Sequence, residues 1–333
     1  MDSFKQNILQ FNRQLTNKNL KRSDLERLKG SNPDAVIVIG IGGSTLTGDL
    51  LRAVRREIGL KVPVVVWKDY GLPALSEVEG PNISGWRIKN PLYVFVSFSG
   101  NTEEPLSGIK MLLKSKKKSL VAAVSSGGQL YDLARTHRLP LVSFPAHGLT
   151  PRQATGSMFY SVVAILRAAG FPVKVSDYTR LDPKRFLKSG QALAKKLRNR
   201  LIVIYTDSAH DYLGYIWKIK FNETAKTPAF NNVLPEMDHN EINAFARKSF
   251  PVTALFLSDA THHRLGKKFA LTQKLLKEKG VSVLNLKLKG NSELEKTWRG
   301  IILADWTTYF LAKLNRVDPA KTEIIERLKK LMG

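Results

Sequence analysis

The sequence contains no cysteine among its 333 residues. This absence excludes disulfide frameworks, zinc–thiolate sites, iron–sulfur clusters and any cysteine nucleophile. No apolar run approaches the roughly 20 residues that a membrane helix needs, and the start of the chain has no apolar core of the signal-peptide type. We therefore expect a soluble cytoplasmic protein without a membrane partner.

Acidic residues are scarce: 28 Asp and Glu stand against 53 Lys and Arg, which gives a net charge of +25. A nucleic-acid-binding protein is one interpretation of this excess. However, the basic residues are spread along the chain, with no basic stripe interleaved with aromatics and no recognition motif. We therefore favour a solvated basic surface over a nucleic-acid partner. Such a surface attracts anionic substrates at low ionic strength.

Short apolar runs alternate with segments of helical spacing, in two blocks along the chain. Runs without polar alternation predict strands buried on both faces of a parallel sheet. The expected strands are 35–39, 62–67, 92–96, 120–124 and 139–144 in the first block, and 201–205, 252–257 and 281–286 in the second. This βαβ pattern predicts an α/β fold with two domains, each a parallel sheet flanked by helices.

The break between the two blocks lies near residues 147–151, so we expect domains at 1–148 and 149–333. Three further helices are predicted outside the βαβ pattern. The first 30 residues have amphipathic helical spacing, and a long helix is expected over 151–169, because Pro151 suits a first helical turn. The last is expected over 319–331, after Asp318 as N-cap.

The first of three glycine- and hydroxyl-rich loops is GIGGST at 40–45, between an expected strand and helix. Glycines such as Gly42 and Gly43 let a ligand approach the backbone, and Ser44 adds a hydroxyl. The spacing matches neither the dinucleotide fingerprint nor the P-loop. A tight strand-to-helix turn without a ligand is the alternative interpretation.

The second loop, SFSGNTEE at 97–104, brings Ser97, Ser99 and Thr102 to one expected helix start. Hydroxyl donors, backbone N–H groups and the helix dipole can hold a phosphate without cationic side chains. Ordinary N-capping is the alternative, but capping needs one hydroxyl rather than three. The third loop, SSGG at 125–128, adds Ser125. Because the carboxyl ends of parallel strands lie at one sheet edge, the three loops together predict a phosphate site.

These loops resemble those of the sugar isomerase (SIS) fold. The whole chain resembles the bifunctional phosphoglucose/phosphomannose isomerases, with the matching stretches in family order. They are IGIGGSTLTGDLL, VSFSGNTEEP, SSGGQL, TPRQATG, NETAKTPAFNNVLPEMDHNEI and DWTTYFLAKLNRVDP. The block from 222 to 242 is the most specific. One departure is Thr45, where the family often has Gly or Ala after GGS; tighter substrate preference and no effect both remain open.

The resemblance implies two SIS domains and a homodimer with its active site near the subunit interface. It implies a phosphorylated hexose as substrate and no metal or other cofactor. The implied reaction interconverts glucose 6-phosphate or mannose 6-phosphate with fructose 6-phosphate, a step of glycolysis and gluconeogenesis.

The resemblance also assigns roles to five residues. Glu223 matches the catalytic base, His239 the ring-opening histidine and Arg152 an arginine near the reacting carbons. Thr322 and Lys329 match a substrate-contacting Thr and Lys, although Lys330 leaves that register open. In relatives the histidine can come from the partner subunit, so Glu223 and His239 need not meet within one chain.

The chemistry of aldose–ketose isomerisation is consistent with these roles. A cis-enediol mechanism needs one base that reaches C1 and C2, a proton shuttle for the ring, and positive charge near the enediolate oxygen. The alternative for each residue is an ordinary surface or structural position. For the whole chain, the alternative is a non-catalytic SIS-type sugar-phosphate sensor. A glutamine-dependent amidotransferase half would need a cysteine.

Overall fold

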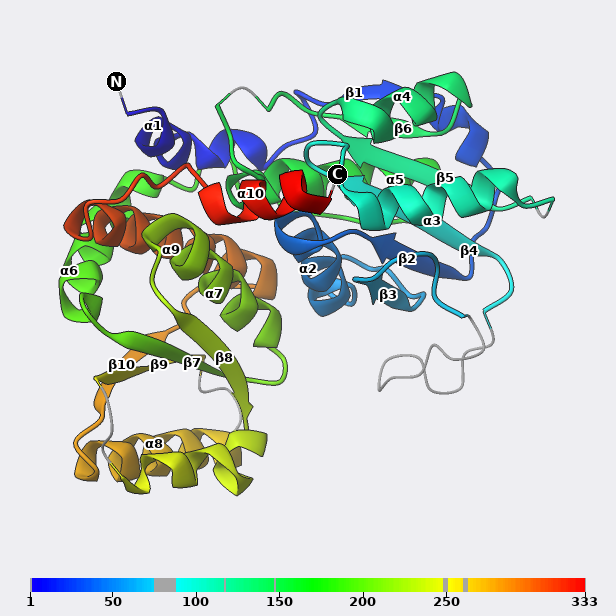
Figure 1. The fold of residues 1–333 in the computed structure, drawn as a ribbon. Coiled ribbons are helices and arrows are strands. Elements are labelled where there is room, and N and C mark those ends of the chain that lie inside the picture. The colour runs from blue at the N-terminus through cyan, green and yellow to red at the C-terminus, as the bar shows by residue number, and fades with distance from the viewer. Residues whose placement is uncertain are drawn as a thin grey trace. The chain divides into compact units, whose positions relative to one another are not determined.

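The computed structural model describes residues 2–74, 88–116, 118–146, 148–247, 251–259 and 263–332. The chain forms two compact units, coloured by residue number in Figure 1. The first unit comprises residues 10–181, and the second comprises residues 1–9 together with 182–333. Each contains one largely parallel sheet flanked by helices, which confirms the predicted α/β fold.

The first unit ends later than the boundary that the sequence suggests at 148/149. The reason is helix α5 (Thr155–Ala168), which packs against the first sheet rather than the second. Twelve of its 14 residues are buried. A helix that is buried on nearly all sides belongs to the core of the sheet that it covers.

The first unit is built on a six-stranded sheet of order β1-β6-β5-β4-β2-β3, in which only β1 is antiparallel to its neighbour. Its elements, with η for 3-10 helices, are η1 (Phe11–Gln14), β1 (Lys21–Ser23), η2 (Leu25–Leu28), β2 (Ala35–Ile39), η3 (Gly42–Ser44), α2 (Leu46–Val54), β3 (Val64–Trp67), β4 (Pro91–Ser97), α3 (Glu103–Lys114), β5 (Leu120–Ser125), α4 (Gly128–Thr136), β6 (Leu141–Ser143), η4 (Pro151–Gln153) and α5.

Both faces of this sheet are covered by helices, which explains its unbroken apolar strands. Alternate residues such as Ile37, Phe95 and Ala123 face α3 and α4 in one apolar core. The residues between them face α2 and α5: a Cβ added at Gly48 of α2 would lie 3.0 Å from Val38. The two-residue period therefore assigns α3 and α4 to one face and α2 and α5 to the other.

The second unit is built on a four-stranded, fully parallel sheet of order β10-β9-β7-β8. Its elements are α1 (Ser3–Leu9), η5 (Pro183–Phe186), α6 (Leu187–Leu197), β7 (Leu201–Asp207), α7 (Asp211–Ala225), β8 (Ala229–Leu234), η6 (Glu236–His239), η7 (Glu241–Ala246), β9 (Val252–Ser258), α8 (His263–Glu278), β10 (Ser282–Lys287), α9 (Glu293–Leu314) and α10 (Glu323–Met332).

Helix α9 organises the second unit, with 14 of its 22 residues buried and extensive packing against α6 and α7. A buried ion pair fixes α7 to α9: Lys220 Nζ lies 2.5 Å from Asp305 Oδ1. The start of the chain joins the same unit because Asp2 accepts a hydrogen bond from Tyr309 at 2.7 Å and pairs with Lys313 at 3.0 Å.

The structure differs from the sequence expectations in other places as well. The first 30 residues are not one amphipathic helix, because their apolar residues serve two units: Phe4 and Ile8 are buried in the second, and Phe11, Leu15 and Leu28 in the first. Strand β8 was not predicted, since its polar AFNNVL sequence suits an edge strand rather than a buried one.

The terminal helix α10 starts at Glu323 rather than at residue 319. None of the helices within the described ranges has the length and apolarity needed to cross a membrane.

Candidate active site

The three glycine- and hydroxyl-rich loops meet at the carboxyl edge of the first sheet, because they follow the neighbouring strands β2, β4 and β5. Direct hydrogen bonds join them. The Phe98 amide donates to Ser44 Oγ at 3.1 Å, and the Ser126 hydroxyl donates to the Phe98 carbonyl at 2.5 Å. The three loops therefore converge as predicted, and their hydrogen-bonded backbones form one continuous cradle.

Glycines allow this close approach. Gly100 has a φ of +74°, and a Cβ there would lie 1.8 Å from the Gly127 carbonyl oxygen. At Gly43 a Cβ would lie 3.0 Å from the Pro151 carbonyl carbon and 3.1 Å from the Arg152 nitrogen. The first loop, where Gly42 has a φ of +57°, thus lies directly against the segment that carries Arg152.

The predicted phosphate-binding hydroxyls divide into two pairs. Ser97 and Ser125 are fully buried. Ser97 Oγ accepts from the Gly100 amide at 3.0 Å and lies 2.9 Å from Thr102 Oγ1, while the Ser125 hydroxyl donates to the Gly127 carbonyl at 2.7 Å. Ser99 is exposed and Thr102 is half-buried. Ser97 and Ser125 therefore stabilise the loop conformations through internal hydrogen bonds. Ser99 and Thr102 carry the hydroxyls that lie at the loop surface.

Helix α3 begins directly after the second loop without a side-chain cap. Thr102 occupies the N-cap position in an extended conformation, but its hydroxyl does not bond to the first turn, and Ser99 Oγ accepts only from the Asn101 amide at 3.2 Å. Simple N-capping thus does not account for the three hydroxyls. The first-turn N–H groups keep the positive end of the helix dipole directed at the loop.

Arg152 is buried at the rim of the same cradle. It lies in η4, where Pro151 occupies the first turn and a capping box between Thr150 and Gln153 fixes the backbone. Only 1% of Arg152 is exposed. A buried guanidinium held next to a glycine loop is suited to stabilise negative charge on a ligand, because a low local dielectric strengthens the interaction.

Glu223 lies half-buried in the last turn of α7, in the second unit. Just beyond it, Lys226 ends the helix in a left-handed conformation, with a φ of +51°. Lys226 Nζ donates to three carbonyls, those of Glu223 at 2.8 Å, Asp318 at 2.5 Å and Lys321 at 2.6 Å. This ammonium group therefore holds the end of α7 against the segment that leads into α10.

The same segment places Thr322 and Lys329. Thr322 is half-buried immediately before α10, and its carbonyl accepts from the Glu326 amide at 3.0 Å. Lys329 lies two helical turns further on the same face and is exposed, with Nζ 3.2 Å from Glu326. Lys226 thus brings the Thr322 end of this segment close to Glu223.

His239 lies away from Glu223 in the second unit. Helix α7 runs antiparallel to β8, because Asn222 near its end accepts from the Ala229 amide at 2.8 Å while Asn231 donates to Asp211, its first residue, at 2.9 Å. Glu223 is therefore at the amino end of β8, and the exposed His239 follows its carboxyl end. The six residues of β8 span roughly 16 Å, so one chain does not bring these two side chains together.

Comparison with known proteins places this geometry in a family. The model of the bacterial phospho-glucose isomerase C-terminal SIS domain matches residues 187–332. The bifunctional phosphoglucose/phosphomannose isomerase of Aquifex aeolicus is 31% identical over 92% of this chain and 91% of its own length. The chain belongs to the bifunctional phosphoglucose/phosphomannose isomerase family.

Other relatives agree with this assignment. The family member of Thermoplasma acidophilum is 30% identical over 89% of this chain and 88% of its own length. Among solved structures, the glucosamine-6-phosphate deaminase of Thermotoga maritima superposes with a TM-score of 0.67 at 15% identity, covering 96% of this chain and 97% of its own. The family assignment confirms the resemblance inferred from the sequence, and the structural match confirms the SIS fold.

Lys226 is a residue near Glu223 whose structural role the sequence reasoning missed. It stands in the same NETAK stretch as Glu223, but a lysine at a helix C-terminus normally indicates only a favourable interaction with the dipole. Its left-handed backbone and its bonds to carbonyls about 90 residues away depend on tertiary structure. The one sequence indication of such a role is a lysine, with its long cationic side chain, at the C-terminal end of the helix.

A second polar cluster lies at the carboxyl edge of the second sheet. His210 is 3% exposed; its Nδ1 lies 2.7 Å from Asp207 and its Nε2 lies 2.9 Å from Glu293. Burial favours the neutral ring, but the Asp207 hydrogen bond and the charges of Asp207, Glu293 and Asp259 outweigh it, so the pKa of His210 is raised.

The donor set of Asp207, His210 and Asp259 could in principle hold a metal ion, since their ligand atoms lie within 4.8 Å of one another. Lys296 already supplies a cation there, with Nζ 2.7 Å from Asp259 and 2.6 Å from Glu293. Lys296 and His210 therefore pair with the three carboxylates of the cluster in one ion network.

Proposed function

We propose that this protein interconverts glucose 6-phosphate, mannose 6-phosphate or both with fructose 6-phosphate, through a cis-enediol and without a metal ion or other cofactor. The names of its relatives support an aldose–ketose isomerase acting on phosphorylated hexoses. A phosphorylated substrate is retained in the cytoplasm by its charge, which is consistent with a cytoplasmic enzyme.

The observation that carries this proposal is the uncharged cradle at 40–45, 97–102 and 125–128 with the buried Arg152 against it. Loops without charged side chains bind phosphate through hydroxyls, amides and a helix N-terminus. A single guanidinium then remains for the reacting end of the sugar. This division suits a substrate with one phosphate and one carbon centre that becomes negative during the reaction.

In the proposed mechanism, Ser99 and Thr102 bind the phosphate, with Ser44, Ser97 and Ser125 supporting the loops and Gly42 and Gly43 admitting the sugar. His239 transfers a proton to open the ring. Glu223 removes the proton from C2 of the open aldose and returns it to C1, and Arg152 stabilises the enediolate oxygen. Thr322 and Lys329 contact the substrate from the terminal segment.

We propose a homodimer as the active form. The separation of Glu223 from His239 along β8 supports it, because a histidine from the partner subunit would complete the site that one chain leaves divided. A stripe on α10 is also unusually apolar for a surface: Ile324 is 86% exposed and Leu331 is 76% exposed. Exposed apolar stripes of this kind mark interaction surfaces.

The test is a coupled assay of the purified protein with each of the three hexose phosphates, with and without EDTA. We expect turnover between fructose 6-phosphate and at least one aldose phosphate, unchanged by the chelator. Glu223→Gln should lower kcat by about 1,000-fold while retaining substrate binding, because the amide keeps the shape but cannot accept the proton. No turnover on any substrate would contradict the proposed function, and loss of activity with EDTA would contradict the metal-free mechanism.

A further inference from the structure

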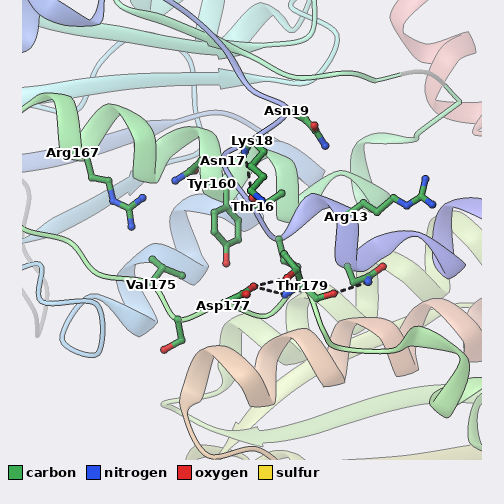
Figure 2. Close-up of a pocket in the computed structure, with 13 residues that line it drawn as sticks. Arg13, Thr16, Asn17, Lys18, Asn19, Tyr160, Arg167, Val175, Asp177 and Thr179 are labelled. Atoms are coloured by element: carbon green, nitrogen blue, oxygen red, sulfur yellow. Dashed lines mark hydrogen bonds between the residues drawn. The ribbon is translucent and has the colours of Figure 1, made fainter.

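A polar cavity of about 510 Å³ lies within the first unit, outside the loops and residues of the proposed reaction (Figure 2). It is lined by residues 12–19, by the outer side of α5 and by residues 175–179. Its volume falls in the range of small-molecule sites. Arg167 lies in the last turn of α5, about 18 Å along the helix axis from Thr155 in the first turn.

The charge of the cavity favours an anion. Three cations line it, Arg13, Lys18 and Arg167, against one carboxylate, Asp177. Asp177 is already engaged by Thr179, whose amide and hydroxyl donate to it at 2.9 Å and 2.6 Å; the hydroxyl bond, followed by the amide bond, lowers the pKa of Asp177.

Asn17 orients one of these cations. With its amide turned to donate to the Tyr160 carbonyl at 3.1 Å, its oxygen accepts from Arg167 Nη1 at 2.6 Å. Arg167 Nε also donates to the Val173 carbonyl at 3.2 Å. A guanidinium fixed by two protein oxygens is pre-organised, so it loses little side-chain freedom when a ligand binds.

Tyr160 supplies an independent indication of a ligand. Only 4% of this residue is exposed, and its hydroxyl has no hydrogen-bond partner among the described residues. In Figure 2 the ring of Tyr160 extends from α5 into the cavity, with its oxygen toward the Val175–Thr179 segment. Burial raises the pKa of Tyr160, so the hydroxyl stays protonated and remains a donor. A buried donor left unsatisfied is costly, whereas a phenylalanine would fill the same space without that cost.

We propose that this cavity is a second binding site, for a small phosphate ester, with Arg167 on the phosphate and the Tyr160 hydroxyl donating to the ligand. A phosphate fits better than an uncharged sugar, because guanidinium groups bind its oxygens through charge-assisted hydrogen bonds. The site is one at which a phosphorylated metabolite can bind without competing for the reaction centre. It stands independently of the proposed isomerase function.

The test uses glycerol 3-phosphate, a phosphate ester without a carbonyl group, which no aldose–ketose isomerase can convert. Calorimetric titration is carried out on the full chain with the second loop disabled by Ser99→Ala and Thr102→Val, so that remaining binding reports the cavity. We expect one site per chain to remain. Adding Arg167→Gln should weaken its binding by roughly tenfold or more, and Tyr160→Phe should weaken binding without lowering the unfolding temperature.

The matched control is Arg135→Gln, which removes an arginine from α4 on the other face of the first sheet. It should leave the affinity unchanged. Hydrogen exchange on the unaltered chain provides a second measurement, with glycerol 3-phosphate expected to slow exchange at 12–19 and 175–179. No binding in the loop-disabled chain together with unchanged exchange would overturn the proposal. So would equal affinity in Arg167→Gln, Tyr160→Phe and Arg135→Gln.

Discussion

At the carboxyl edge of the first sheet the loops carry glycines and hydroxyls, whereas the same edge of the second sheet carries carboxylates, a histidine and a lysine. The loops at 40–45, 97–102 and 125–128 contain no charged side chain. At the second edge, Asp207 is the last residue of β7, Asp259 follows β9, and His210 and Lys296 lie against these two carboxylates. Two sheets of one fold class have thus acquired edges of opposite electrostatic character.

The difference shows that the fold provides a sheet edge, and that the side chains at this edge determine whether it can bind a phosphate or forms internal ion pairs. Neutral donors around a helix N-terminus can hold a phosphate through hydroxyls, amides and the helix dipole. Carboxylates at the second edge repel phosphate and instead require internal cations, which His210 and Lys296 supply. We therefore expect changes at the first edge to affect catalysis, and changes in the Asp207–His210–Lys296 network of the second edge to affect stability alone.

The largest expected effect comes from Gly100→Ala, which adds a methyl group where the second and third loops are in close contact. The new methyl group would overlap the Gly127 carbonyl, and the left-handed backbone adds strain. We expect a loss of at least about 3 kcal/mol in unfolding free energy and at least about 100-fold in kcat/KM, measured by urea unfolding and the coupled assay.

Gly30→Ala is the matched control for this variant. Gly30 has the same φ of +74°, but nothing lies within 4 Å of an added Cβ. Gly30→Ala should therefore cost only the backbone strain, about 1 kcal/mol, with activity retained. Equal losses in the two variants would show that the close approach of the loops does not matter.

At the second edge, Asp207→Ala should destabilise the protein without impairing catalysis. The change removes the acceptor of both the His210 amide at 2.9 Å and its Nδ1 at 2.7 Å, and leaves a buried imidazole poorly paired. We expect a loss of about 3 kcal/mol in unfolding free energy, with kcat unchanged below the unfolding transition. A large fall in kcat in the folded variant would mean that the second edge also takes part in the reaction.

A smaller effect is expected from Lys226→Gln, which releases the segment before α10 from the end of α7. The side chain is exposed, so stability should change little, but three charge-assisted hydrogen bonds to carbonyls are lost. We expect kcat/KM to fall by about tenfold. Lys226→Arg should restore part of it, and a rescue of kcat by arginine would distinguish positioning of Glu223 from mere loss of surface charge.

The sequence alone predicted the loops at the first edge, because each loop directly follows the strand that positions it. Each loop follows an apolar strand directly, so the parallel-sheet rule alone predicts that Ser44, Ser99 and Ser125 converge. The family pattern likewise located Glu223 and Arg152 from short stretches of sequence. The placement of these residues in the active site remains a prediction.

Features that depend on distant segments could not be predicted. The three carbonyls around Lys226, the edge strand β8 with its polar residues, and the cavity formed by 12–19 and 175–179 all join parts of the chain far apart in sequence. The domain boundary differed for the same reason, since burial of α5 against the first sheet is decided by packing rather than by local spacing.

The smallest expected effect is the pH dependence of stability at the second edge. His210 is faced by Asp207, Glu293 and Asp259, and Lys296 pairs with the last two of these carboxylates. Because the folded state raises the pKa of His210, its contribution is fully present below the unfolded value of about 6.5 and is lost as the pH rises through the folded value. The urea midpoint should therefore fall as the pH is raised from about 6.5 into the alkaline range.

His210→Asn should flatten that slope, because the amide cannot titrate. The comparison of the two edges also predicts that this slope appears in unfolding and is absent from the pH dependence of kcat. If His210→Asn instead shifts the pH profile of kcat, the ion network around His210 takes part in the reaction and does more than stabilise the fold.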